Sequence, residues 1–277
     1  MNETDACAEF CRRHRLEIVS VRPGAFGGSK YVAHVRDAGG RSLMLKQTTP
    51  ERGPIEIAAL RAWQGNDAAV QLVEELGGGA YVTEFLEGTP VSELPSSSPV
   101  DFTAIGRMLR ALHRTDAPAE MPDIRARFTA PAMGEWSELT PAMIRLAQVT
   151  AASVRAYAPP RRVLLHGDVV PANVILTADG PRVIDPLACS GLPAWDIAQF
   201  AVAAAGRGRR DVIRPLLGGY GEKPPHLADT FAWLHFFFLR NNLAAGRQEF
   251  AESLRPLANE IVRLNNPDEF LRSQGVG

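Results

Sequence analysis

"VLLHGDVVPANVIL", residues 163–176, places a polar loop between two short apolar runs. The loop carries His166, Asp168 and Asn173, and the runs on either side have the composition of short strands. A further short strand is expected just before Asp185, in the segment "VIDP". The sequence therefore predicts two carboxylates and an amide at neighbouring strand ends.

This order and spacing are typical of a phosphoryl-transfer catalytic loop, in which an Asp and an Asn are followed by a metal-binding Asp after the next hairpin. Asp168 is the candidate catalytic residue, which would orient or deprotonate a substrate hydroxyl. Asn173 and Asp185 are candidate ligands of Mg²⁺, which prefers oxygen ligands. Each residue alone is common in polar turns, and it is the complete set that favours catalysis.

Along the rest of the chain, the expected secondary structure changes once, from mainly strands to mainly helices. The chain begins with a short polar helix, expected over residues 4–15. Strands are then expected over residues 16–22, 30–36, 42–47, 70–76 and 80–86, with one helix inserted over residues 54–64. The second part has helical spacing over residues 102–114, 141–157 and from 195 onward. A β-rich segment followed by an α-rich one predicts an α+β fold with an N-lobe, residues 1–86, and a C-lobe, residues 87–277.

Composition narrows the class of protein. The chain of 277 residues is 45% apolar with a formal net charge of −1, which is ordinary for a globular protein and gives no sign of a nucleic-acid partner. No signal peptide is recognised at the start, and the longest apolar stretch, residues 231–239, is too short to span a membrane. Cys7 and Cys11 are spaced poorly for a disulfide. We therefore expect a reduced, cytoplasmic protein without a membrane partner.

Five motifs give a more specific indication: "MLKQ", "YVTEFLEG", "LLHGDVVPANVIL", "VIDP" and "WDIAQF" follow one another in this order. With them the chain resembles, over nearly its whole length, the aminoglycoside phosphotransferase family, including its viomycin and capreomycin phosphotransferase branches. The resemblance implies a protein-kinase-like two-lobe fold. It also implies a small-molecule O-kinase that uses ATP or GTP together with Mg²⁺.

The resemblance assigns nucleotide-binding roles in the N-lobe. Lys46 matches the lysine that neutralises the α- and β-phosphates, and Glu56 would be its ion-pair partner, with Glu51 as the competing candidate. The carbonyl of Glu84 and the N–H of Leu86 would bond the edge of the base, and Thr83 would line the back of the base pocket. The glycine-rich segment between the first two strands would approach the phosphates, through Gly24, Gly27, Gly28 and Ser29.

Three further residues are expected to have structural roles and to take no part in the chemistry. His166 would brace the loop by hydrogen bonds. Asp196 would begin a helix and bind backbone N–H groups of the loop. His113 is expected to be a packed helix residue. Because Pro186 and Leu187 follow Asp185, and only ten residues separate Asp185 from Asp196, there is no room for a regulatory activation segment.

The acceptor is less well defined. The "VIDP" form resembles branches acting on streptomycin-like aminoglycosides and on viomycin or capreomycin, so a basic antibiotic, with resistance as the outcome, is the first choice. A cationic acceptor predicts carboxylates in the C-lobe, for which the candidates are Glu135, Glu138, Asp211, Glu222 and Asp229. The alternatives are a metabolic kinase acting on an amino alcohol or a sugar and, less favoured, a nucleotide-binding module without catalysis.

Overall fold

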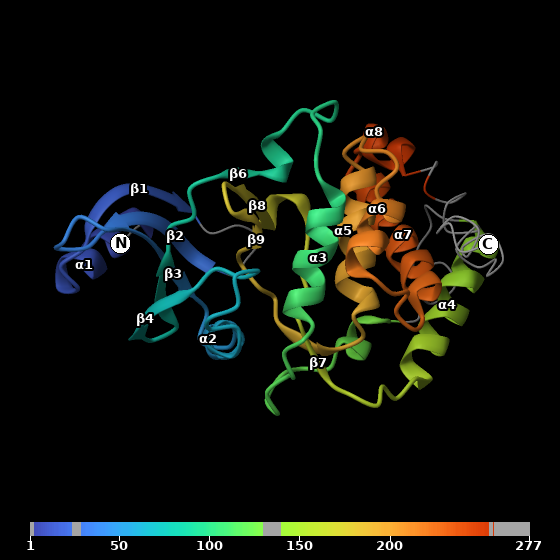
Figure 1. Ribbon diagram of the computed structural model, residues 1–277, viewed down its shortest axis with the longest axis horizontal. Coiled ribbons are helices and arrows are strands. Elements are labelled where there is room, and N and C mark those ends of the chain that lie inside the picture. The colour runs from blue at the N-terminus through green and yellow to red at the C-terminus, as the bar shows by residue number, and fades with distance from the viewer. Residues whose placement is uncertain (1–2, 24–28, 130–139, 255–256, 258–277) are drawn as a thin grey trace. The chain divides into compact units, whose positions relative to one another are not determined.

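The computed structural model describes residues 3–23, 29–129, 140–254 and 257. The chain divides into two compact units, Met1–Gly88 and Thr89–Gly277. This division falls two residues after the boundary expected between the lobes. The fold is α+β, with an antiparallel sheet in the first unit and mainly helices in the second (Figure 1).

The N-terminal unit, drawn from blue to teal in Figure 1, is a five-stranded sheet with strand order β1-β2-β3-β5-β4. All its paired neighbours are antiparallel. Its elements are α1 (Glu3–Arg13), β1 (Glu17–Pro23), β2 (Ser29–Arg36), β3 (Ser42–Thr48), α2 (Gly53–Ala62), β4 (Leu72–Gly77) and β5 (Ala80–Glu84).

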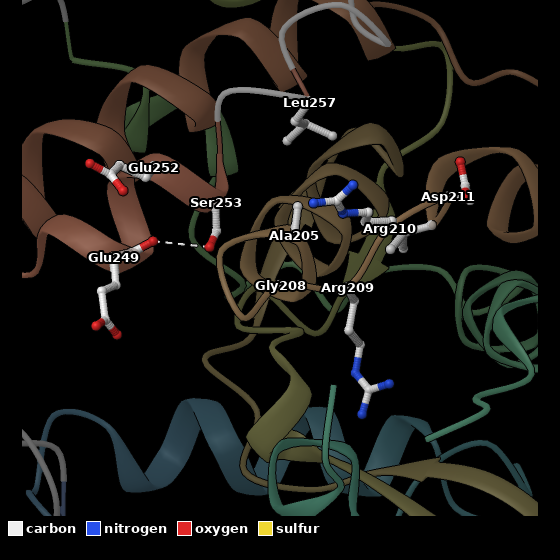
Figure 2. A pocket seen from close by; sticks show the side chains of 10 residues that line it. Ala205, Gly208, Arg209, Arg210, Asp211, Glu249, Glu252, Ser253 and Leu257 are labelled. Carbon is white, nitrogen blue, oxygen red and sulfur yellow. Dashed lines mark hydrogen bonds between the residues drawn. The ribbon is translucent and has the colours of Figure 1, made fainter. Parts of the chain in front are cut away.

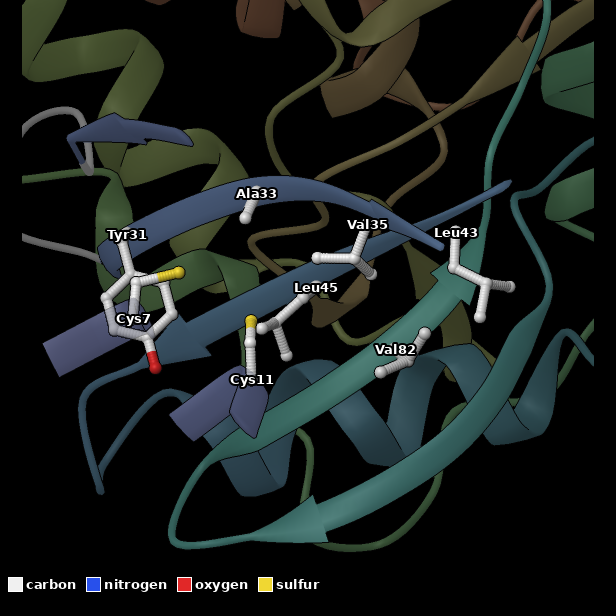
Figure 3. Close-up of a cluster of buried hydrophobic side chains, with 8 residues drawn as sticks. All are labelled: Cys7, Cys11, Tyr31, Ala33, Val35, Leu43, Leu45 and Val82. Carbon is white, nitrogen blue, oxygen red and sulfur yellow. The ribbon is translucent and has the colours of Figure 1, made fainter. Parts of the chain in front are cut away.

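One face of this sheet is apolar and is covered by α1 (Figure 3). Alternate residues of the strands form the cluster, because successive side chains of a strand point to opposite faces; its members are Cys7, Cys11, Tyr31, Ala33, Val35, Leu43, Leu45 and Val82. Cys7 and Cys11 are free thiols, and burial raises the pKa of Cys11 to about 12. They pack as small apolar side chains. The other face carries Lys46, which is therefore turned toward α2.

The C-terminal unit contains most of the helices. Its elements are β6 (Thr89–Pro90), η1 (Val91–Glu93), α3 (Phe102–Leu112), η2 (Ile124–Arg127), α4 (Pro141–Ala156), β7 (Val163–Leu165), η3 (Pro171–Asn173), β8 (Val174–Thr177), β9 (Gly180–Val183), β10 (Cys189–Gly191), α5 (Ala194–Ala205), α6 (Ile213–Tyr220), α7 (Leu227–Ala244) and α8 (Gln248–Ser253).

Two of these helices, α3 and α6, pack so closely that their backbones are in contact. A Cβ built on Gly106 of α3 would lie 2.1 Å from the carbonyl oxygen of Leu216, and a Cβ on Gly219 of α6 would lie 1.9 Å from that of Thr103. The N-terminus of α3 is capped by Asp101, whose carboxylate accepts from the N–H of Ala104 at 2.9 Å. The glycines thus let the N-terminal half of α3 pack closely against the C-terminal half of α6.

Short strands bracket the catalytic loop. β7 pairs with β10, and β8 pairs with β9 and with β6. The sequence predicted β7, β8 and β9 but not β10, whose residues Cys189-Ser190-Gly191 have weak strand propensity. Among the residues that the structure describes, no helix has the length and apolar character needed to cross a membrane.

Candidate active site

The catalytic loop runs from the end of β7 to the start of β8, and its path depends on Gly167. This residue has φ +75°, and a Cβ there would lie 2.2 Å from the carbonyl oxygen of Leu187. Glycine is therefore required both by the backbone conformation and by the available space. The turn at Gly167 presents the next residue, Asp168, beside the first turns of α5.

Asp168 is partly buried and is held by two amide groups. Gln199 donates from Nε2 to Oδ1 at 3.0 Å, and Asn173 donates from Nδ2 to Oδ2 at 3.1 Å. Burial raises the pKa of Asp168, and the negative charge of Asp185 acts in the same direction. Each carboxylate oxygen keeps a further lone pair, so Asp168 can still accept a hydrogen bond from a hydroxyl.

The two candidate metal ligands are joined through the backbone. The N–H of Ile184 donates to the carbonyl of Asn173 at 3.0 Å, so Asp185 follows directly after a residue bonded to the loop. Asp185 is exposed and adopts φ 59°, a left-handed conformation uncommon outside glycine. The amide nitrogen of Asn173 also donates to the carbonyl of Asp168, at 2.9 Å, which turns its amide oxygen away from Asp168.

His166 braces the loop, as expected. Its Nε2 lies 2.8 Å from the carbonyl oxygen of Ile184, so this nitrogen carries the proton and donates. Its Nδ1 then accepts from the N–H of Asp168, at 3.3 Å. The ring therefore links the end of β9 to the catalytic loop, and both its nitrogens are used.

Asp196 ties the loop to α5, also as expected. Its carboxylate is fully buried and accepts from the N–H groups of His166 and Gly167, both at 2.8 Å. His113 Nε2 lies 3.0 Å from Asp196 Oδ2, and His113 Nδ1 lies 3.1 Å from the hydroxyl of Tyr220. Burial alone would raise the pKa of Asp196, but the hydrogen bond from His113 and the nearby charges bring it below its usual range.

Three residues around this loop were not predicted from the sequence. Arg127 donates to the carbonyls of Gly167 and Leu187, both at 2.7 Å, and its guanidinium lies 5.8 Å from the ring of Trp195. Gln199 and Trp195 lie on α5. A signal existed for Gln199, since it follows Asp196 by three residues and so lies on the same side of the helix. Arg127 precedes the loop by about forty residues, and its sequence context gave no signal.

The predicted ion pair of the N-terminal unit is present. Lys46 Nζ donates to Glu56 Oε2 at 2.8 Å, and the two side chains are 8% and 1% exposed. Glu51, the competing candidate, is exposed. Tyr81 was missed: its hydroxyl donates to the same Glu56 oxygen at 2.7 Å. Strand alternation could have indicated it, because Tyr81 lies two residues before Thr83 and opposite Lys46 in the sheet.

The other predicted nucleotide-binding residues are only partly described. Glu84 ends β5, its N–H donates to Gln71, and its carbonyl accepts from the Thr83 hydroxyl at 3.2 Å. Leu86 lies just beyond the strand, which ends two residues earlier than expected. Ser29 is the first residue of β2. The three glycines of the preceding segment lie outside the described residues, namely Gly24, Gly27 and Gly28.

The acidic candidates for the acceptor site lie in different surroundings. Glu135 and Glu138 fall outside the described residues. Asp229 is engaged locally, accepting from the Ser153 hydroxyl at 2.9 Å. Glu222 is exposed and lies near Tyr220, where burial raises the pKa of the phenol and the charge of Glu222 acts in the same direction.

Asp211 lines a cavity of about 610 Å³ at the end of α5 (Figure 2). Arg209 and Arg210 belong to the same wall, and Glu249 and Glu252 of α8 face it. The cavity is therefore of mixed charge. Asp185 and Arg127 are charged side chains that act on Asp168, and neither is one of the acceptor-site candidates Asp211, Glu222 and Asp229.

Comparison with known proteins identifies the family to which this chain belongs. The sequence profile of the phosphotransferase enzyme family (APH) matches residues 20–235. No curated protein sequence matches the chain significantly.

Many solved structures share the fold. The macrolide 2'-phosphotransferase MphH from Brachybacterium faecium has a TM-score of 0.63 and 20% identity, covering 91% of this chain and 98% of that one. A choline/ethanolamine kinase family protein from Mesorhizobium loti has a TM-score of 0.66 and 16% identity, covering 99% and 100%. The GDP and kanamycin complex of APH(2")-IIia has a TM-score of 0.59 and 15% identity, covering 94% and 99%.

Proposed function

Because the chain belongs to the phosphotransferase enzyme family, we propose that it transfers the γ-phosphoryl group of ATP or GTP to a hydroxyl of a small, amine-bearing molecule. The observation that carries this proposal is the carboxylate of Asp168, held by two neutral amides on the loop that follows β7. A carboxylate so placed can accept the proton of the attacking hydroxyl.

The metal ligands proposed are Asn173 and Asp185. Their oxygens suit Mg²⁺, and the amide orientation of Asn173 leaves its oxygen facing away from Asp168. Within the described part of the chain, no three or more His, Cys, Asp or Glu side chains are arranged so that they could hold a metal ion by themselves, which fits a metal that takes its remaining ligands from phosphates and water. When bound, Mg²⁺ would neutralise charge on the nucleotide phosphates.

The N-terminal unit would hold the nucleotide. Lys46 keeps its ammonium group in one place because Glu56 is itself fixed by Tyr81, and this supports a role on the α- and β-phosphates. The backbone of Glu84 and Leu86 would bind the base. The glycine-rich segment before β2, together with Ser29, would lie along the phosphates. We further propose that the protein acts in the cytoplasm, where nucleoside triphosphates are plentiful.

The acceptor we propose carries both a hydroxyl and an amine. The solved structures that share the fold include proteins named for aminoglycosides and for choline or ethanolamine, and a hydroxyl near an amine is common to these compounds. A basic antibiotic, either an aminoglycoside or a viomycin- or capreomycin-type cyclic peptide, remains the first candidate, with resistance as the outcome. The second candidate is a small amino alcohol. It is favoured by the separate surroundings of Asp211, Glu222 and Asp229, which lie at the cavity after α5, near Tyr220 and against Ser153.

A nucleotide-consumption screen tests the proposal. Purified protein with Mg²⁺ and either ATP or GTP is given aminoglycosides, viomycin, capreomycin, choline, ethanolamine and neutral sugars, with phosphorylated product detected by mass spectrometry. We expect transfer to an amine-bearing acceptor and none with Asp168→Ala. Transfer only to neutral sugars, or none to any acceptor, would contradict the proposal.

A further inference from the structure

Gln199 is the one side chain outside the catalytic loop that the structure shows hydrogen-bonded to the Asp168 carboxylate, counting the described residues. It lies in the second turn of α5 and is 7% exposed. Its Nε2 donates to Asp168 Oδ1 at 3.0 Å. The other oxygen, Oδ2, accepts from Asn173 on the loop itself. The two amides therefore approach the carboxylate from different elements.

The orientation of the Gln199 amide is set by Trp195, one turn earlier on the same helix. Trp195 Nε1 donates to Gln199 Oε1 at 3.0 Å, and the indole is 5% exposed. An indole N–H can only donate, so the oxygen of the Gln199 amide has to face Trp195. The nitrogen of that amide must then face Asp168.

We propose that Gln199 is a positioning residue that sets the plane of the Asp168 carboxylate, and that Trp195 holds the amide in the orientation required. The inference rests on the proposed role of Asp168 as the base. Rotation of the carboxylate would break the bonds from both Gln199 and Asn173, so the oxygens stay where a hydroxyl can reach their remaining lone pairs.

The same helix also holds the backbone of the loop. Trp195 Nε1 shares its proton with the carbonyl of Gly167, at 3.2 Å, and Asp196 accepts from the N–H of that residue. The start of α5 thus fixes the backbone before Asp168 and, through Gln199, the carboxylate itself. A neutral amide suits this task because it adds no charge that would compete for the substrate proton.

The contact can be tested without an acceptor by NMR of the full-length protein. The chain has four tryptophans, so its indole N–H signals are few enough to assign by substitution. We expect Gln199→Met to move the indole signal of Trp195, and Asp168→Ala and Trp195→Phe each to move the side-chain amide signals of Gln199. The matched control is Gln64→Met, at an exposed position, which should leave the Trp195 indole signal in place.

Kinetics then test positioning, with the best acceptor from the screen. Gln199→Met keeps the length of the side chain but removes the donor, and Gln199→Glu keeps its shape and replaces the donor by an acceptor. We expect kcat to fall roughly 10- to 100-fold in both, as it does when outer partners of a reactive group are lost, with KM for the nucleotide within about twofold of wild type. Trp195→Phe should lower kcat less, and should add little to Gln199→Met.

The outcomes separate this inference from the proposed function. If Asp168→Ala is inactive while folded Gln199→Met and Gln199→Glu keep wild-type kcat, the inference is wrong and the proposed function stands. The inference is also wrong if the NMR signals of Trp195 and Gln199 do not move in the variants described above. A wild-type protein that transfers to no acceptor overturns the proposed function. If Gln199→Met does not fold, the same measurements on Gln199→Glu and Trp195→Phe decide the question.

Discussion

At the scale of single residues, Gly167 has little freedom to change. Its φ is +75°, and an added Cβ would lie 2.2 Å from the carbonyl of Leu187 and 2.9 Å from Cys189 Sγ. We predict that Gly167→Ala lowers the free energy of unfolding by about 1–3 kcal/mol and turnover by roughly tenfold or more, because the loop must shift. Denaturant unfolding and steady-state rates measure both, and a variant equal to wild type in both would contradict the assignment.

A second residue-scale prediction concerns the metal. Asp185→Asn replaces the charged ligand proposed for Mg²⁺ by a neutral one, so nucleotide affinity in the presence of Mg²⁺ should fall roughly tenfold or more. Asn173→Ala removes a ligand that was already neutral and should have a smaller effect. Titration calorimetry with and without Mg²⁺ measures this. Equal affinity of Asp185→Asn and wild type with Mg²⁺ present would rule out Asp185 as a ligand.

The site could be predicted from the sequence where its residues form a local pattern. Asp168 and Asn173 lie on one loop, and the Lys46–Glu56 pair joins a strand to the helix that follows it. Contacts that depend on packing between distant segments were missed. Arg127 reaches the loop from η2, and no periodicity or spacing in its own neighbourhood indicates that.

At the scale of secondary-structure elements, apolar spacing predicted the long helices and the main strands, with ends that differ by a few residues. β10 was not predicted, because it is a three-residue strand whose existence depends on its partner: Cys189 pairs with Leu165 and Gly191 with Val163. The 3₁₀ turn that carries Arg127, η2, was likewise absent from the expectation. Short elements of this kind are stabilised by tertiary contacts more than by propensity.

The contact between α3 and α6 gives an element-scale prediction. It brings His113, just after α3, to Tyr220 at the end of α6, and so supports Asp196. Gly219→Ala would place a Cβ 1.9 Å from the carbonyl of Thr103, and should destabilise the protein by about 1–3 kcal/mol.

Gly218→Ala is the matched control for this change. It lies one residue earlier in the same helix, and a Cβ there meets nothing within 4 Å. It should therefore be neutral or stabilise by up to about 1 kcal/mol, since alanine favours helix over glycine. Equal melting temperatures for the two variants would show that the close contact does not matter to stability.

At the scale of the whole molecule, charge distinguishes the two acceptor candidates. The formal net charge is −1, so the chain as a whole exerts little attraction on a cation. If the acceptor is a polycationic antibiotic, local carboxylates must attract it, and KM should rise when KCl is raised from low to physiological strength, since salt screens such attraction. A singly charged amino alcohol should show a much weaker dependence. If KM for a polycationic antibiotic that is a substrate does not change with KCl concentration, the electrostatic part of this account is wrong.

The measurement that tests the central claim most directly compares Asp168→Ala with wild type and with the control Asp179→Ala, in the exposed turn between β8 and β9. Nucleotide affinity and single-turnover transfer to the best acceptor are measured on each protein. With Asp168 as the base acting on the acceptor hydroxyl, its loss should slow transfer by roughly 100-fold or more while nucleotide affinity stays within about threefold. Asp179→Ala should match wild type in both. Transfer by Asp168→Ala at a near wild-type rate would contradict the account.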